Sequence, residues 1–227
     1  MSAPKRNTDK EQIAREAYLQ FAAAADEFEK YTNPHAVRIA VIADRIAETF
    51  HLAPQDRKSL RTAARMHDVG EVAMERDYIQ RAGSLTDEER IDLERHPIIG
   101  EREAARANAD RAAQLLVRWH HEWWNGGGYP DALRQNEIPL GARILRVADS
   151  YASLTDARPY RPAMGEDAAR GLIIERAGVE FDPEVVTALL SLEDFAELKS
   201  YVKPVETPLE RSDSNDDNWN LFSSFMR

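Results

Sequence analysis

Apolar residues recur every three or four positions through most of this sequence. The segment 35–50, HAVRIAVIADRIAETF, shows the pattern clearly, and 140–156, LGARILRVADSYASLTD, repeats it. Such spacing places the apolar side chains on one face of an α-helix. We find neither a convincing alternation of apolar and polar residues, as strands require, nor an internal repeat. The chain is therefore predicted to be all-α, folded as a helical bundle.

Capping residues and prolines mark where the helices begin. Thr8–Glu11 and Thr86–Glu89 have the spacing of a capping box, in which Ser or Thr is followed three residues later by Glu or Gln. Asn33 before Pro34 predicts a second start, with Asn as the N-cap and Pro in the first turn. His96-Pro97 predicts a break before another helix. Further helices are predicted at 54–69, 111–121, 140–156, 165–177 and 183–192.

The length of 227 residues suits one domain with extensions. We predict a helical extension over 1–30, a central domain over 31–200 and an acidic, disordered tail over 201–227. The chain lacks an apolar run long enough for a membrane span, and its start lacks a secretory signal, so we expect a cytoplasmic protein. The net charge of −10 argues against DNA or RNA as a partner, since nucleic-acid binding needs a basic face.

The stretch 118–133, RWHHEWWNGGGYPDAL, places two histidines side by side. On a helix two adjacent rings point about 100° apart and reach different neighbours. Either a helix simply ends there, or His120 and His121 serve two nearby metal ions. The chain has no cysteine, so any metal must be held by His, Asp and Glu.

Considered singly, the other histidines have ordinary explanations as residues at helix ends. As a set with two aspartates they suggest a metal centre. Asp149 lies inside a strongly apolar helix, where a carboxylate without a partner would cost several kcal/mol. Five imidazoles and two carboxylates suit two divalent transition-metal ions, with Fe or Mn favoured. The candidate ligands are His35, His67, Asp68, His96, His120, His121 and Asp149.

Five motifs occur together in one order: MHDVG, HP followed by IGE, HHEWWNGGGYP, ARILRVADSYASLTDARPYR and GVEFDPEVV. In this respect the chain resembles the HD-GYP domain, a group of cyclic di-GMP phosphodiesterases within the HD metal-dependent phosphohydrolases. The resemblance covers roughly residues 30–195. It implies that His67 and Asp68 are the name-giving catalytic pair, with Asp68 bridging both metals. His35 and Asp149 would complete one ion's ligands, and His96, His120 and His121 the other's.

The same resemblance assigns other positions. Gly128-Tyr129-Pro130 would form the loop beside the site, where Gly128 and Tyr129 take part in substrate binding and a signalling protein can dock. Arg158 and Arg161 match basic residues that bind the ligand's phosphates, a task suited to the planar guanidinium. From the residues alone, both arginines could instead pair with surface acids.

Two positions depart from the family pattern. Glu71 stands where a lysine is usual, which reverses the local charge and affects turnover, substrate choice or metal binding. Family members with three metals carry a Glu four residues before the first His, and this chain has Tyr31 there. We therefore expect two ions. No sensory domain is expected before the catalytic region, since 1–30 supplies only a helix.

The leading hypothesis is a dinuclear metal-dependent phosphodiesterase that opens cyclic di-GMP to linear pGpG, and onward to GMP, in bacterial second-messenger signalling. One alternative is a catalytically weak domain that binds cyclic di-GMP or a partner protein, because Glu71 replaces lysine. Another keeps the catalysis but changes the substrate to a different cyclic dinucleotide or nucleotide phosphate. A homodimer is left open.

Overall fold

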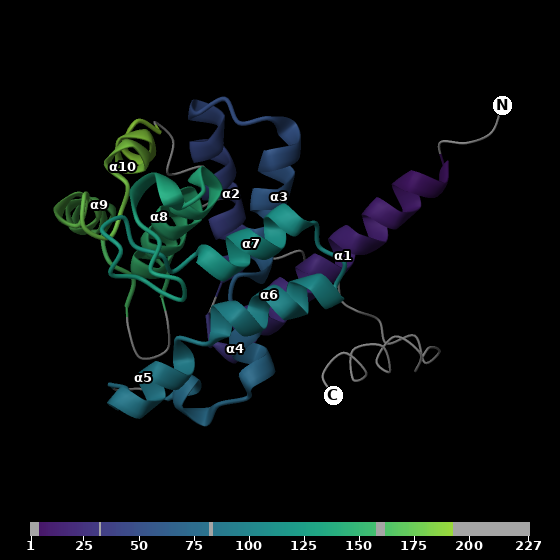
Figure 1. The fold of residues 1–227 in the computed structure, drawn as a ribbon, viewed down its shortest axis with the longest axis horizontal. Coiled ribbons are helices and arrows are strands. Elements are labelled where there is room, and N and C mark those ends of the chain that lie inside the picture. The colour runs from purple at the N-terminus through teal and green to yellow at the C-terminus, as the bar shows by residue number, and fades with distance from the viewer. Residues whose placement is uncertain (1–4, 32, 82–83, 158–161, 193–227) are drawn as a thin grey trace.

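The structure is a computed structural model that describes residues 5–31, 33–81, 84–157 and 162–192 (Figure 1). These residues form ten α-helices, two short 3₁₀ helices and one isolated parallel bridge, so the all-α prediction is confirmed. In chain order the elements are α1 Lys5–Phe28, α2 His35–Thr49, α3 Pro54–Met66, α4 Val69–Met74, η1 Asp77–Gln80, α5 Asp87–Leu93, α6 His96–Arg106, α7 Arg111–Trp119, η2 Gln135–Glu137, α8 Leu140–Thr155, α9 Glu166–Glu175 and α10 Pro183–Leu190.

Several helix starts differ from the sequence prediction. The capping box at Thr86 is confirmed, because its side chain accepts from the Glu89 N–H and Glu89 bonds back. Thr8, by contrast, lies inside α1. Helix α2 starts at His35, one residue later than predicted, because Pro34 has a ψ of 79°, outside the helical range. His96 is the first residue of α6 rather than a break before it.

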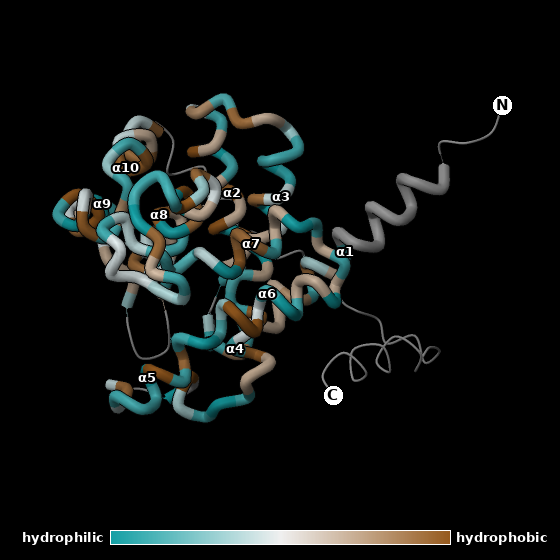
Figure 2. The backbone as a smooth tube through the Cα atoms, viewed as in Figure 1, coloured by the Kyte–Doolittle hydropathy of each residue, from teal (hydrophilic) through white to brown (hydrophobic). Residues whose placement is uncertain are grey.

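The core lies where α2, α3, α7 and α8 pack together. Figure 2 shows apolar and polar residues alternating along the helices, as amphipathic helices require. The largest fully buried side chains include Ile39, Ile42, Ile46, Leu60, Met66, Ile144, Leu145 and Tyr151. Burial of each such side chain contributes about 1.5–3 kcal/mol. These helices form a rigid frame, and the ends of several of them meet at the candidate site.

The short helix α4 crosses α6 at very close range. A Cβ added to Gly70 would lie 2.0 Å from the carbonyl oxygen of His96 and 2.8 Å from the backbone nitrogen of Gly100. Only glycine permits this approach. The crossing holds the residues just before α4 against the first turn of α6, so it fixes the distance between Asp68 and His96.

The long helix α1 runs diagonally across the molecule and packs against α2, α3 and α4 near its C-terminal end (Figure 1). Ala22, Ala25, Asp26 and Glu29 are buried there. Helices α9 and α10 pack on α8 at the other side of the molecule.

None of the described helices combines the length and apolarity that a bilayer crossing needs. The predicted tail, 201–227, lies outside the described residues, and the domain boundaries stay a prediction.

Candidate metal centre and pocket

The ends of five helices and the interior of a sixth meet at one place. His35 begins α2, His67 follows α3, Asp68 precedes α4, and His96 begins α6. His120 and His121 follow α7, and Asp149 lies within α8. All of these residues are buried except His121, which is half-buried. The structure thus brings the seven predicted ligands together, in two groups that could each hold an ion.

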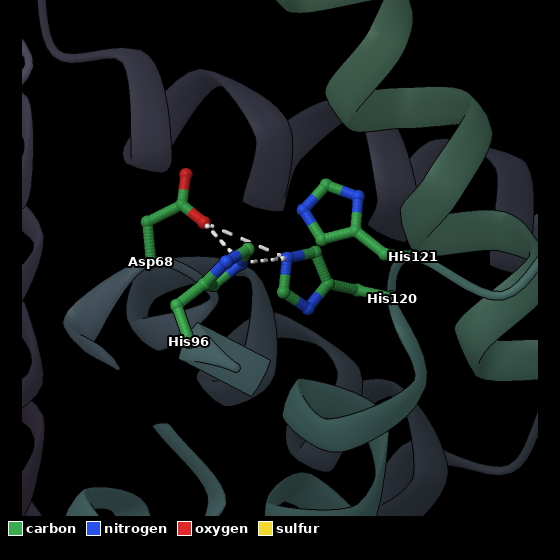
Figure 3. Close-up of side chains that lie close together, drawn as sticks. All are labelled: Asp68, His96, His120 and His121. Atoms are coloured by element: carbon green, nitrogen blue, oxygen red, sulfur yellow. Dashed lines mark hydrogen bonds and ion pairs between the residues drawn. The ribbon is translucent and has the colours of Figure 1, made fainter. Parts of the chain in front are cut away.

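The first group consists of Asp68, His96, His120 and His121 (Figure 3). Asp68 Oδ1 lies 3.3 Å from His96 Nε2 and 3.5 Å from His120 Nε2. The two imidazole nitrogens are 3.3 Å apart. Figure 3 shows the His121 ring beside that of His120, with one ring nitrogen directed toward the Asp68 side. One carboxylate and three imidazoles are a donor set that suits Zn, Fe or Mn.

The second group consists of His35, His67 and Asp149. Asp149 Oδ1 lies 3.8 Å from Nε2 of His35 and 3.8 Å from Nε2 of His67. His67 Nε2 also lies 2.8 Å from the other carboxylate oxygen of Asp68, Oδ2. Asp68 therefore faces both groups, one through each oxygen, which is the arrangement that the bridging role requires.

Backbone carbonyls fix the rings of three histidines. Nδ1 of His67, His96 and His120 donates to the carbonyl oxygen three residues earlier, at distances of 3.0, 2.8 and 2.6 Å. A carbonyl can only accept, so the proton on each of these nitrogens is assigned by its partner. In the neutral ring the Nε2 lone pair is then left facing the group, as in metal sites where a hydrogen bond at the outer nitrogen orients the ligand.

His35 has a carboxylate in the same orienting role. Its Nδ1 donates to Asp156 Oδ2 at 2.8 Å, and Arg38 bonds the other oxygen at 2.7 Å. The Tyr31 ring stacks on the ring of His35, with a centroid distance of 3.7 Å. Sequence reasoning missed Arg38 and Asp156. One signal was present for Asp156: it lies four residues after Ala152, an apolar position of the predicted helix, and therefore on the same face.

The carboxylates of Asp68 and Asp149 next to His67 make this a favourable place for a cation. Burial would lower the pKa of His67, but the carboxylates of Asp68 and Asp149 outweigh it and raise that pKa to about 10. Burial raises the pKa of Asp149, yet His35 and His67 bring it down to about 2. The buried His67 Nε2 and Asp68 Oδ1 have no hydrogen-bond partner of good geometry. Unsatisfied donors and acceptors of this kind, beside two ionised carboxylates, fit divalent metal ions.

A third group of possible ligands adjoins the first two. Glu29, from the end of α1, lies close to Asp68 and Glu71, and the three carboxylates could hold an ion together. Sequence reasoning looked for a Glu at the position of Tyr31 and did not consider Glu29, two residues earlier. The number of ions, two, stays a prediction. Glu71 is itself a member of a possible ligand group, together with Glu29 and Asp68.

The loop after His121 packs on the first group without lining the pocket found in the described residues. The Tyr129 ring stacks on His121 with a centroid distance of 4.8 Å, and the Tyr129-Pro130 peptide bond is cis. A Cβ on Gly128 would lie 2.3 Å from the Trp123 backbone nitrogen, so glycine is required there for packing. Glu122, which sequence reasoning also missed, is buried and accepts N–H bonds from Asp131 and Leu133. The predicted substrate roles of Gly128 and Tyr129 stay predictions.

A pocket of about 510 Å³ opens beside the candidate metal ligands. Asp68, His121 and Asp149 contribute to its wall, as do Glu29 and Glu71. Its other walls combine apolar and polar residues. The apolar ones include Ile79, Leu93, Leu154, Leu172 and Phe181, and the polar ones include Arg81, Arg146, Arg176 and Glu180. The volume lies within the usual range for a small-molecule site. Arg158 and Arg161, the predicted phosphate-binding residues, lie outside the described residues.

Three comparisons with known proteins agree with this geometry. The HD domain family model matches residues 20–185. The cyclic di-GMP phosphodiesterase response regulator RpfG of Xanthomonas campestris pv. campestris is 36% identical over 183 residues, which cover 79% of this chain and 48% of that protein. The 3'3'-cGAMP-specific phosphodiesterase 2 of Vibrio cholerae is 28% identical, covering 80% of this chain and 35% of that protein.

Among solved structures, a cyclic GMP-AMP-specific phosphodiesterase of V. cholerae matches 84% of this chain and 51% of that one, with a TM-score of 0.66 and 20% identity. This likeness confirms the fold. The chain spans about half or less of the length of the relatives it matches. The family match covers most of the chain and contains all seven predicted ligands, so this protein belongs to the HD domain family.

Proposed function

We propose that this protein is a metal-dependent phosphodiesterase that hydrolyses cyclic di-GMP to linear pGpG, and onward to GMP, in bacterial second-messenger signalling. One observation carries the proposal. Asp68 faces two groups of possible ligands through its two oxygens, and both groups border a pocket large enough for a nucleotide. Two divalent ions, Fe or Mn, fit the imidazole and carboxylate donors.

When bound, such a pair of ions polarises a phosphate and activates water for attack on phosphorus. The chain's own residues hold and orient the participants. His67, His96 and His120, fixed through their Nδ1–carbonyl bonds, would hold the ions through Nε2, and Asp68 lies between the two groups. Arg158 and Arg161 are proposed to bind the phosphates. Glu71 borders the same pocket, and its negative charge there is proposed to slow turnover at the catalytic pair His67 and Asp68.

Two alternatives have specific support. Glu71 places a negative charge where the resembling family has lysine, which favours a slow enzyme or a domain that binds cyclic di-GMP or a partner protein without turnover. The relative from V. cholerae named for 3'3'-cGAMP favours a mixed cyclic dinucleotide as the substrate. We also propose a signalling-protein contact at the 128–130 loop, a cytoplasmic location, and no nucleic-acid or membrane partner. A homodimer remains compatible with the chain.

The deciding experiment combines metal content with hydrolysis. The protein is reconstituted without oxygen with Fe²⁺ or Mn²⁺, analysed for metal, and incubated with cyclic di-GMP and, separately, 3'3'-cGAMP. We expect two ions per chain and slow conversion of cyclic di-GMP to pGpG. His67→Ala and Asp68→Ala should lose metal and activity but keep the helical content. At most one bound ion would overturn the dinuclear site, and an intact substrate at full metal load would favour the binding domain.

A further inference from the structure

Arg146, one turn before Asp149 on α8, touches both groups of metal ligands. Its Nη1 donates to Nδ1 of His121 at 3.0 Å and lies 3.6 Å from Asp149 Oδ2. Its Nη2 donates to Glu180 Oε1. The side chain is only 15% exposed. The guanidinium thus stands between a ligand of the first group and a ligand of the second.

Glu180 anchors this arginine from the opposite side. It is 4% exposed, and its second oxygen accepts from Arg176 at 2.7 Å. Its backbone is fixed as well, because the carbonyl oxygen of Glu180 accepts from the Trp124 N–H at 3.1 Å. Glu180 can therefore hold Nη2 of Arg146 in place while Nη1 changes its partner.

Arg146 also borders the pocket. Of the residues that the structure describes, three arginines do so: Arg81, Arg146 and Arg176. Arg81 forms a two-bonded pair with Glu89, and its side chain is 49% exposed. Arg176 is 59% exposed. Arg146 alone among these three contacts the metal ligands, so its charge lies nearest to where the reacting phosphate must sit.

We propose that Arg146 binds the phosphate of the substrate, with Glu180 as its positioning residue. The inference rests on the proposed function. An ion bound to Asp149 neutralises that carboxylate, which frees the charge of Arg146 for an anion. Arg146 already borders the pocket beside both groups, and a guanidinium suits phosphate oxygens because its donors lie in a fixed plane. Arg146 would then be a phosphate-binding residue in addition to Arg158 and Arg161, the two expected from sequence.

The competing explanation is that Arg146 only balances the charges of Asp149 and Glu180. A measurement of inorganic phosphate binding distinguishes this explanation from the proposal. The measurement is the same whichever dinucleotide is the substrate. Wild type, Arg146→Gln and Arg146→Lys are loaded with Mn²⁺, freed of excess metal, analysed for metal content and titrated with inorganic phosphate by calorimetry. Arg57→Gln is the matched control, because Arg57 also holds two carboxylates, Asp44 and Glu48, yet does not border the pocket.

We expect Arg146→Gln to raise the phosphate Kd by roughly ten-fold or more at unchanged metal content, as the loss of a charge-assisted hydrogen bond does. Arg146→Lys should also weaken binding, because an ammonium cannot reach Glu180 and a phosphate together, and it decides the matter if the Gln variant does not fold. Arg57→Gln should match wild type. An unchanged Kd in either Arg146 variant, or a loss that only follows lost metal, overturns the proposal. Phosphate binding by a wild type that leaves cyclic di-GMP intact would refute the proposed function and leave this inference standing.

Discussion

Nδ1 of His35 lies 2.8 Å from Oδ2 of Asp156, and both side chains are buried. The bond joins the first residue of α2 to the residue that directly follows α8. Because Asp156 can only accept when ionised, the His35 proton sits on Nδ1 and Nε2 turns toward Asp149. A carboxylate that orients a histidine in this way also raises the basicity of the ring as a metal ligand.

Replacing Asp156 with Asn should therefore weaken metal binding while the fold survives. Asn keeps an oxygen for Arg38 but removes the charge behind His35, and loss of such an orienting partner lowers metal affinity by about 10–100-fold. Competition with a chelating dye measures the change. Asp44→Asn is the matched control, since Asp44 is a half-buried carboxylate that also accepts from arginine, through Arg57 and Arg61, but it contacts neither ligand group. Equal metal affinities in the two variants would contradict the orienting role.

Metal binding should release protons. Without metal, the pKa of His67 is raised to about 10, because the carboxylates of Asp68 and Asp149 outweigh the effect of burial. At pH 7.5 the ring is then protonated, and an ion that takes Nε2 must displace that proton. Apparent metal affinity should accordingly rise with pH up to about 10, by about ten-fold per unit for each proton released. Calorimetry in two buffers of different ionisation enthalpy gives the proton count, and a count of zero would refute this account.

Gly128→Ala should destabilise the loop that follows His121. The new Cβ would lie 2.3 Å from the Trp123 nitrogen and 2.4 Å from the His121 carbonyl oxygen, so backbone must move. We expect a loss of about 1–3 kcal/mol in the free energy of unfolding. Gly171→Ala is a control of opposite sign: it lies within α9 with nothing within 4 Å of its Cβ, and alanine should stabilise the helix by up to about 1 kcal/mol. Denaturant unfolding of both variants tests the contrast.

The sequence predicts the helices well, and it picks out the seven residues that the structure brings together. Helical spacing of apolar residues is a local signal, and it leads to the all-α bundle that the structure confirms. A histidine or a buried carboxylate is unusual enough in an apolar context to be noticed, as Asp149 was. Helix ends are less certain, because backbone angles such as the ψ of Pro34 follow from packing.

The partners of the ligands could not be predicted. Arg146 and Glu180 are 34 positions apart in the chain, and charged residues of this kind are far more often at the surface. Glu29 illustrates the same limit. Its place beside Asp68 depends on how α1 packs against α4, and no spacing within α1 indicates that crossing.

Substitution of Glu71 distinguishes two roles for its carboxylate: a negative charge that slows turnover, or a ligand that the enzyme needs. Glu71 borders the pocket together with Glu29 and Asp68. We expect a slow wild type with two ions, in which Glu71→Lys raises kcat/KM, because a cation near the developing negative charge on the phosphate stabilises it. Steady-state kinetics with cyclic di-GMP, beside metal analysis, measures both effects. Glu75→Lys is the control, since it makes the same charge change at an exposed position that does not border the pocket. A Glu71→Lys variant that loses an ion and its activity would show instead that Glu71 is a ligand, with Glu29 and Asp68, of a third metal ion.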